Sequence, residues 1–155
     1  MNMLLHSGRY TIRDFRPDDL EPLHVILGDP VVMKYIEAPF SRERTATFLQ
    51  SNGLDALPLV YALADGEDYV IGQVIFHPWD DTAWEIGWIL HRDCWGRGLA
   101  TAVTKALLDE CGRRGIKRCV IECHPQQAAT RHIAEKCGFS RTEDRDGLAC
   151  FILDL

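Results

Sequence analysis

Hydrophobic and polar positions alternate in some stretches of the chain and recur at helical spacing in others. Alternation predicts strands, and recurrence every three or four residues predicts helices. The helical stretches are 98–114 and 128–137, with two more that begin after Arg16 and at Ser41. Strand character marks 10–15, 59–64, 69–77, 83–91, 117–123, 140–144 and 148–155. The order β α α β β β α β α β β predicts an α/β (α+β) fold with a mixed central sheet and flanking helices.

Turn residues separate these elements and indicate how they connect. Asp65-Gly66 and the run 78–81 mark turns between three consecutive strands, which indicates an antiparallel meander. Asp146-Gly147 indicates a closing hairpin. Residues 31–40 are apolar but follow neither period, as expected of a segment that lines a site. Because no repeat or linker-like run divides the chain, we expect one domain over residues 1–155.

Charge and cysteine content narrow the classes of function. The chain has 17 Lys+Arg against 23 Asp+Glu, a formal net charge of −6. This balance disfavours nucleic acid as a partner and mildly favours cationic ones. The six cysteines lie in the second half of the chain, and the pair Cys119 and Cys123 lacks a matching second pair. We therefore expect free thiols and no metal site.

The chain shows no targeting or membrane signal. No stretch approaches the roughly 18–20 apolar residues that a membrane span needs. The first residues, MNMLLH, lack the basic and apolar regions of a signal peptide. We therefore expect no membrane partner and a cytoplasmic location.

The most informative segment is a strand that leads through a loop with two glycines into a helix. Free backbone N–H groups at the start of that helix favour an anion, and Gly96 and Gly98 allow close approach of the backbone. Arg92 and Arg97 could add contacts to phosphate. A dinucleotide fingerprint is excluded because Thr101 stands where the third glycine would be. No Gly-Lys-Ser/Thr follows, so the loop is not a P-loop either.

Two motifs in this order resemble those of the GNAT acetyltransferases. The first joins the strand EIGW (85–88) to the loop WGRGLAT (95–101), and the second is HPQQAATRHIAEKCGF (124–139). The strand EIGW, the tryptophan before the first glycine of the loop and the ending EKCGF look most like the branch that acetylates the N-termini of ribosomal proteins. The resemblance implies the GNAT acyl-CoA N-acyltransferase fold, in which the strands matching 83–91 and 117–123 splay apart. It also implies that the segments matching 31–41 and 140–155 select the substrate.

The resemblance implies acetyl-CoA as the co-substrate and assigns residues to it. The pantetheine arm would pair with the backbone of Trp88, Ile89 and Leu90, and the amides around residues 97–101 would hold the pyrophosphate. The full implied set is Trp88, Ile89, Leu90, Arg92, Trp95, Gly96, Arg97, Gly98, Leu99, Ala100, Thr101, Gln127 and Thr130.

Two positions of the second motif depart from the branch. Gln127 and Thr130 stand where Asn and Ser are usual. Gln127 is one methylene longer, so its contact with the cofactor can differ or be lost. Thr130 keeps a hydroxyl that can donate a proton to the leaving sulfur. The tyrosine that other branches use as general acid would fall at Ala134.

The implied reaction is direct attack of an amine on the thioester in a ternary complex. At pH 7, deprotonation costs about 1 kcal/mol for an α-amine and roughly 4–5 kcal/mol for a lysine-like amine. A base is therefore optional for an N-terminus. Glu85 is the leading candidate base, directly or through water, and an ordinary salt-bridged carboxylate is its alternative. His77 and His91 are other candidates, and Glu122 could play a supporting role.

These features lead to one expected function and one rival. We expect an N-acetyltransferase that transfers acetyl from acetyl-CoA to a peptide N-terminal α-amine or a small primary amine, with Glu85 and Thr130 as catalytic residues. The rival is an acyl-CoA sensor or catalytically impaired domain that acts through a partner. We expect a monomer or a homodimer, which the sequence does not distinguish.

Overall fold

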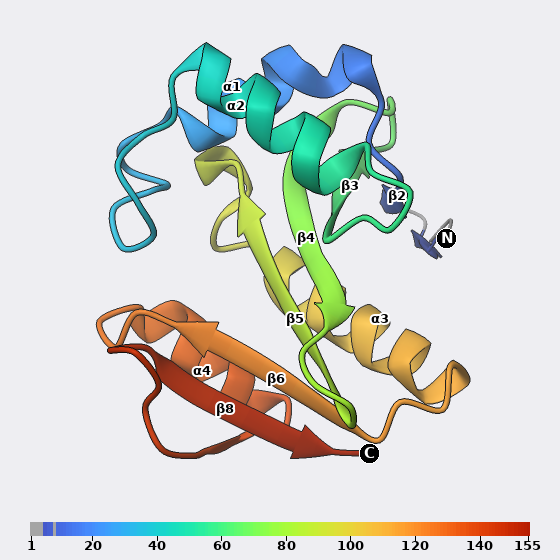
Figure 1. Cartoon of the computed structure of the whole chain (residues 1–155), viewed down its shortest axis with the longest axis vertical. Helices are drawn as coiled ribbons and strands as arrows, with labels where there is room; N and C mark the ends of the chain where they lie inside the picture. Colours follow the sequence, from blue (N-terminus) through green and yellow to red (C-terminus); the bar gives the residue numbers. More distant parts are fainter. Residues whose placement is uncertain (1–4, 8) are drawn as a thin grey trace. The chain divides into compact units, whose positions relative to one another are not determined.

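The computed structural model describes residues 5–7 and 9–155 as a mixed α/β fold (Figure 1). Its described strands form a mixed sheet in the order β1-β2-β3-β4-β5-β6-β8-β7. They are β1 (Leu5–Ser7), β2 (Tyr10–Arg13), β3 (Val60–Asp65), β4 (Val70–Pro78), β5 (Ala83–Leu90), β6 (Arg118–Cys123), β7 (Ser140–Arg141) and β8 (Ala149–Asp154). The helices are α1 (Leu20–Leu27), α2 (Arg42–Phe48), α3 (Leu99–Arg113) and α4 (Ala128–Lys136), with short turns of helix at Pro17–Asp19, Leu49–Gly53 and Arg92–Cys94. The predicted fold class is confirmed.

The chain divides into two compact units, each built from separated stretches of sequence. The first unit comprises Met1–Ile75 and Trp88–Arg97, and the second comprises Phe76–Gly87 and Gly98–Leu155. Strands β4 and β5 each contribute residues to both units.

The first unit has an apolar cluster between its strands and its two helices. Strands β2, β3 and β4 are antiparallel, with Ile12 opposite Leu63 and Ala62 opposite Gln73. Helices α1 and α2 contact each other, and Ser41 caps α2 by accepting a hydrogen bond of 3.0 Å from the Arg44 N–H. The cluster consists of Phe15, Leu23, Ile26, Leu27, Val32, Met33, Phe40, Leu49, Val60, Ala62 and Val70.

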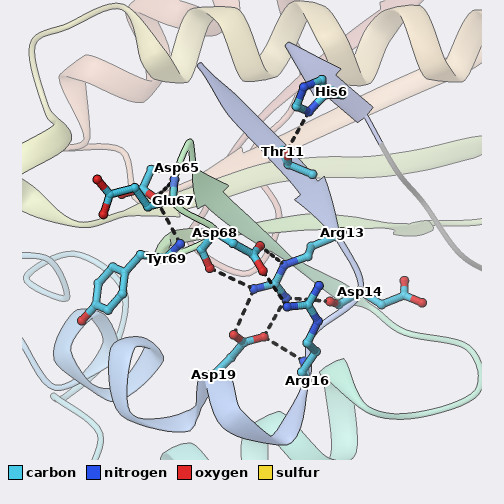
Figure 2. A network of polar contacts seen from close by, with 10 residues as sticks. All are labelled: His6, Thr11, Arg13, Asp14, Arg16, Asp19, Asp65, Glu67, Asp68 and Tyr69. Carbon is cyan, nitrogen blue, oxygen red and sulfur yellow. Dashed lines mark hydrogen bonds and ion pairs between the residues drawn. The ribbon is translucent and has the colours of Figure 1, made fainter. Parts of the chain in front are cut away.

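A buried ion network ties the end of β2 to the turn before β4 (Figure 2). Arg13 is only 6% exposed, and its guanidinium donates to both carboxylate oxygens of Asp19, at 2.8 and 3.1 Å. Its Nε donates to Asp68 at 2.8 Å, and the exposed Arg16 bonds the other Asp68 oxygen at 2.6 Å. These two guanidinium groups hold the pKa of Asp68 below its usual range. The network pairs Arg13 and Arg16 with the carboxylates of Asp19 and Asp68.

The second unit joins β5 to β6 in parallel and β6 to β8 in antiparallel register. The β5–β6 pairing runs from Ala83 opposite Arg118 to Glu85 opposite Val120 and ends there. Pairing of β6 with β8 continues to the end of β6, where Cys123 lies opposite Ala149. Helix α3 packs on β6 through its apolar stripe, and α4 contacts β6 and β7 (Figure 1).

The structure differs from the predicted elements at both ends of the chain. Strand β1 was not predicted because three residues are too short to show a period. The first predicted strand ends at Arg13 rather than residue 15, because the chain turns there to bring Asp19 to Arg13. The closing hairpin is confirmed, but its first strand is only Ser140–Arg141. The turn itself has φ values of 51° at Asp146 and 79° at Gly147, the left-handed pair that a tight hairpin requires.

Two further expectations concern cysteines and membranes. All six cysteines are free thiols, and the Sγ atoms of Cys111 and Cys119 lie 3.3 Å apart inside the second unit. Within residues 5–7 and 9–155, no group of three or more His, Cys, Asp or Glu side chains is arranged to hold a metal ion. Over the same residues, no helix has the length and apolar character needed to span a bilayer.

The ion network predicts a large difference between two arginine substitutions. Arg13→Met leaves the buried Asp19 carboxylate without its cation and should lower the free energy of unfolding by about 3–5 kcal/mol. Arg16→Met removes an exposed partner and should cost less than about 1 kcal/mol. Urea unfolding of both variants measures the difference, and equal costs would contradict a structural role for the Arg13–Asp19 pair.

Candidate active site

The loop before α3 has its two glycines in the left-handed backbone region. Gly96 and Gly98 have φ values of 73° and 76°, in the left-handed region that residues with a Cβ rarely adopt. Gly98 is the N-cap of α3, and no side chain caps the helix. The first N–H groups of α3 therefore lie at an open helix start that carries partial positive charge, which favours an anion.

Two side chains expected at this loop have partners in the first unit. The Arg92 Nε lies 3.1 Å from the carboxylate of Asp29, whose side chain is mostly buried. Arg92 is thus engaged with a carboxylate, whereas Arg97 is exposed. The Trp95 indole is 47% exposed, and its Nε1 donates to the Leu90 carbonyl at 3.1 Å. A phosphate contact from the loop is therefore better placed at Arg97 than at Arg92.

Gln127 lies at the start of α4, where its side chain bonds the loop before the helix. Gln127 is the N-cap of α4, and its Oε1 accepts a hydrogen bond of 3.0 Å from the His124 N–H. The side-chain oxygen of Gln127 is therefore used to stabilise the loop 124–127 before the helix. Thr130, in the first turn of α4, is half-buried, and Ala134 is fully buried where other branches carry a tyrosine.

Glu85 is held by a histidine of the neighbouring strand β4. The His77 Nε2 lies 3.0 Å from Glu85 Oε1, and its Nδ1 lies 2.8 Å from the Pro78 carbonyl. Because both ring nitrogens face acceptors, the doubly protonated imidazolium satisfies both. The hydrogen bond to Glu85 raises the pKa of His77, against the opposing effect of burial. His77 was a candidate base from the sequence, but the structure pairs it with Glu85, and this pairing favours its protonated form.

The other candidate histidine also has a structural role. His91 Nδ1 accepts a hydrogen bond of 3.0 Å from the Asp93 N–H and caps the short helical turn after β5. The nitrogen that accepts this bond is not available to take a proton from an amine.

Glu122 emerges as a second carboxylate on the same face as Glu85. Side chains opposite each other in paired strands share a face, so Glu85 shares one with Val120 and hence with Glu122, two residues further on. Burial, and then the charge of Glu85, raise the pKa of Glu122, while Arg145 opposes the shift. No hydrogen bond or ion pair holds the Glu122 carboxylate within the described chain. From the sequence we expected only a supporting role for Glu122, although it is the one acidic residue of strand β6.

The tryptophans of the second unit serve packing. Trp84 lies on the opposite face of β5 from Glu85, and its ring centroid is 4.8 Å from that of Phe76. The Arg114 guanidinium covers both rings, at 4.9 Å from Phe76 and 5.6 Å from Trp84. Trp79 packs under Arg145 at 5.2 Å.

The His77–Glu85 pair makes a prediction that needs no substrate. Glu85→Gln removes the main group that raises the pKa of His77, so that pKa should fall, with burial now dominating. Glu122→Gln is the matched control, because Glu122 has no part in the His77 shift. NMR titration of the imidazole resonances measures both.

The same pair has a defined effect on stability against pH. Because the folded-state pKa of His77 is raised, its stabilisation is present below the unfolded value of about 6.5 and is lost as the pH rises through the folded value. Glu85→Gln should therefore cost more stability near pH 6 than at pH 9. A His77 pKa that is unchanged in Glu85→Gln would contradict the pairing.

Comparison with known proteins places this geometry in a family. The family described as "Acetyltransferase (GNAT) domain" matches residues 9–140. A relative from Bacillus subtilis (strain 168), named as the uncharacterized N-acetyltransferase YnaD, is 26% identical over 142 residues, covering 90% of this chain and 84% of the relative.

Solved structures share the fold. A GNAT-family acetyltransferase from Bacillus anthracis superposes with a TM-score of 0.86 at 24% identity, covering 98% of both chains. RimL, an α-N-acetyltransferase of ribosomal protein L7/L12 in complex with coenzyme A, has a TM-score of 0.81 at 21% identity, covering 99% of this chain and 98% of its own. Because the family match extends over most of the sequence, this chain is an acetyltransferase and belongs to the GNAT family.

Proposed function

We propose that this chain transfers the acetyl group of acetyl-CoA to a primary amine, either a peptide N-terminal α-amine or a small amine. The observation that carries the proposal is the loop 95–101, with two left-handed glycines before an uncapped helix start. In the reaction, the amine nitrogen forms a bond to the acetyl carbon, the C–S bond breaks, and the sulfur leaves as a thiolate that takes up a proton. The RimL likeness supports the peptide α-amine as one acceptor class.

The cofactor contacts proposed from the family motif can be refined by the hydrogen bonds observed. The Leu90 carbonyl already accepts from Trp95, so the pantetheine arm would use the backbone of Trp88 and Ile89 first. Gln127 Oε1 is engaged with the His124 N–H, so its NH2 group is the part that would reach the cofactor. The amides of 97–101 would hold the pyrophosphate.

We propose that proton transfer uses Thr130 and one of two carboxylates. Thr130 keeps the hydroxyl that would protonate the leaving thiolate. Glu85 is paired with His77, whereas no hydrogen bond or ion pair among the described residues holds the Glu122 carboxylate. Burial raises the pKa of Glu122, which makes it a stronger base than a solvated carboxylate. Glu122 therefore joins Glu85 as a candidate general base. With an α-amine as acceptor, either carboxylate would lower the barrier only a little, because deprotonation of that amine costs only about 1 kcal/mol at pH 7.

The remaining expectations on organisation stay proposals. We propose one domain over residues 1–155, in which the two compact units share β4 and β5, and a monomer or homodimer as the working state. The cytoplasmic location stays a prediction of the sequence.

One observation favours a second candidate function, an acyl-CoA-binding domain that acts through a partner. Gln127 replaces the usual asparagine, and its side-chain oxygen accepts a hydrogen bond from the His124 N–H of the preceding loop. Thr130 and the two carboxylates support the enzyme instead. Release of the CoA thiol that depends on an added amine separates the two functions.

Cofactor binding at the glycine loop is tested by calorimetric titration with acetyl-CoA. Gly98→Trp places a bulky side chain at the proposed pyrophosphate site and should abolish binding. Gly115→Trp is the matched control, since Gly115 has a φ of 73° and, like Gly98, no atom within 4 Å of an added Cβ. It follows the other end of α3, so this variant should bind as the wild type does. Equal binding by both variants would contradict a cofactor site at Gly98.

The identity of the base is tested by the pH–rate profiles of Glu85→Gln and Glu122→Gln with a lysine-like amine. Removing the true base should lower kcat by about 100-fold or more and remove the acidic limb of the profile. The other variant should keep that limb. Profiles unchanged in both variants would exclude both carboxylates from this role.

A further inference from the structure

Gln73 is a polar side chain on an apolar face of the first unit. It lies in β4 and is 3% exposed. Ala62 of β3 is opposite it in the antiparallel register. On its other side, the 2.8 Å hydrogen bond from the His91 N–H to the Ile71 carbonyl sets Ile89 of β5 opposite Gln73. Ile75, two residues along β4, shares its face.

The three neighbours of Gln73 lie in or against the apolar cluster that includes residues of α1. Ala62 is part of that cluster, and Ile75 and Ile89 pack against it. The Oε1 atom of Gln73 is buried and has no hydrogen-bond partner among residues 5–7 and 9–155. A buried acceptor without a donor is costly, and native proteins rarely keep one without a reason.

Other buried polar side chains of this unit do find partners. The Thr45 hydroxyl donates to the Ser41 carbonyl at 2.9 Å, and Arg13 and Asp19 pair with each other. Asp14 also has one unpartnered oxygen, but that residue is only half-buried. Ile75 and Ile89 are half-buried as well, so the cluster does not fully cover the face beside Gln73. An unmet acceptor thus lies next to an incompletely covered apolar surface.

We infer that Gln73 is a specificity-determining residue whose Oε1 accepts a hydrogen bond from an N–H group of the acceptor molecule. This inference rests on the proposed function, which assigns the backbone of Ile89 to the cofactor. Ile89 is the residue opposite Gln73, so a donor held there lies beside the strand proposed to carry the thioester. The donor is either the amine itself or the first amide N–H of a peptide.

Gln73→Met tests the inference, because methionine keeps the length of the side chain without its acceptor. Two acceptors serve as probes, the tripeptide amide Ser-Ala-Ala-NH2 and ethanolamine, which has no amide. The KM of the tripeptide should rise by about 10-fold or more, since one hydrogen bond to the acceptor is lost. The KM of ethanolamine should rise likewise where the donor is the amine itself. The affinity for acetyl-CoA, measured by calorimetry, should stay unchanged.

A stability measurement distinguishes this role from a structural one. Because Oε1 makes no hydrogen bond in the free protein, Gln73→Met should leave Tm unchanged or raise it. Thr45→Val is the matched control, because it removes a buried hydrogen bond that is made. In a chain of this length, that loss should lower Tm by roughly 2–4 °C. It should leave the KM of both probes unchanged.

Each outcome decides the inference. A KM increase for both probes assigns the donor to the amine, and an increase for the tripeptide alone assigns it to the peptide N–H. A KM within about twofold of wild type for both probes, or a Tm lowered as in Thr45→Val, overturns the inference. A wild type that binds acetyl-CoA but acetylates neither probe also overturns it. If the wild type does not bind acetyl-CoA, the result contradicts the proposed function and not the role of Gln73 alone.

Discussion

The short parallel pairing of β5 with β6 is the constraint on which the proposed chemistry depends. It begins at Ala83 and ends at Glu85 opposite Val120. This register places Glu85 and Glu122 on one face, because side chains along a strand alternate between faces. A slip of one residue would turn Glu122 to the helix-packed face and separate the two carboxylates. The pairing also stops before β6 ends, so its last residues are paired with β8 alone.

Buried polar groups are treated in two opposite ways in the first unit. Arg13 is surrounded by carboxylates that match its charge and geometry, so its burial is compensated within the chain. Gln73 is buried to a similar degree, but its oxygen has no such compensation. The first arrangement fixes the position of β2, and the second leaves an unmet hydrogen-bond acceptor. Because of this contrast we assign a structural role to Arg13 and a role in binding the acceptor molecule to Gln73.

Periodicity predicted most of the fold because its helices and strands are long enough to show their spacing. The open helix start after Gly98 was also predictable, since two glycines precede an apolar helical stretch. The left-handed φ values of Gly96 and Gly98 come from the structure alone. The short strand β1 carries no such signal.

The partners of the site residues were not predictable from the sequence. Glu85 meets His77 only through the pairing of two strands, and Arg92 meets Asp29 across a long stretch of chain. Such contacts depend on strand register and tertiary packing, which a single sequence does not encode locally. Even a contact between residues close in sequence was not predictable here. Only the structure shows that the Gln127 side-chain oxygen accepts a hydrogen bond from the His124 N–H.

The central claim, acetyl transfer to an amine, is tested most directly by following the CoA thiol. Wild-type protein is mixed with acetyl-CoA, with and without a panel of N-terminal peptides and small amines, and thiol release is measured together with the acetylated product. The account predicts release that depends on an amine and matches the product mole for mole. Tight binding of acetyl-CoA without amine-dependent release over the whole panel would contradict it and favour the sensor.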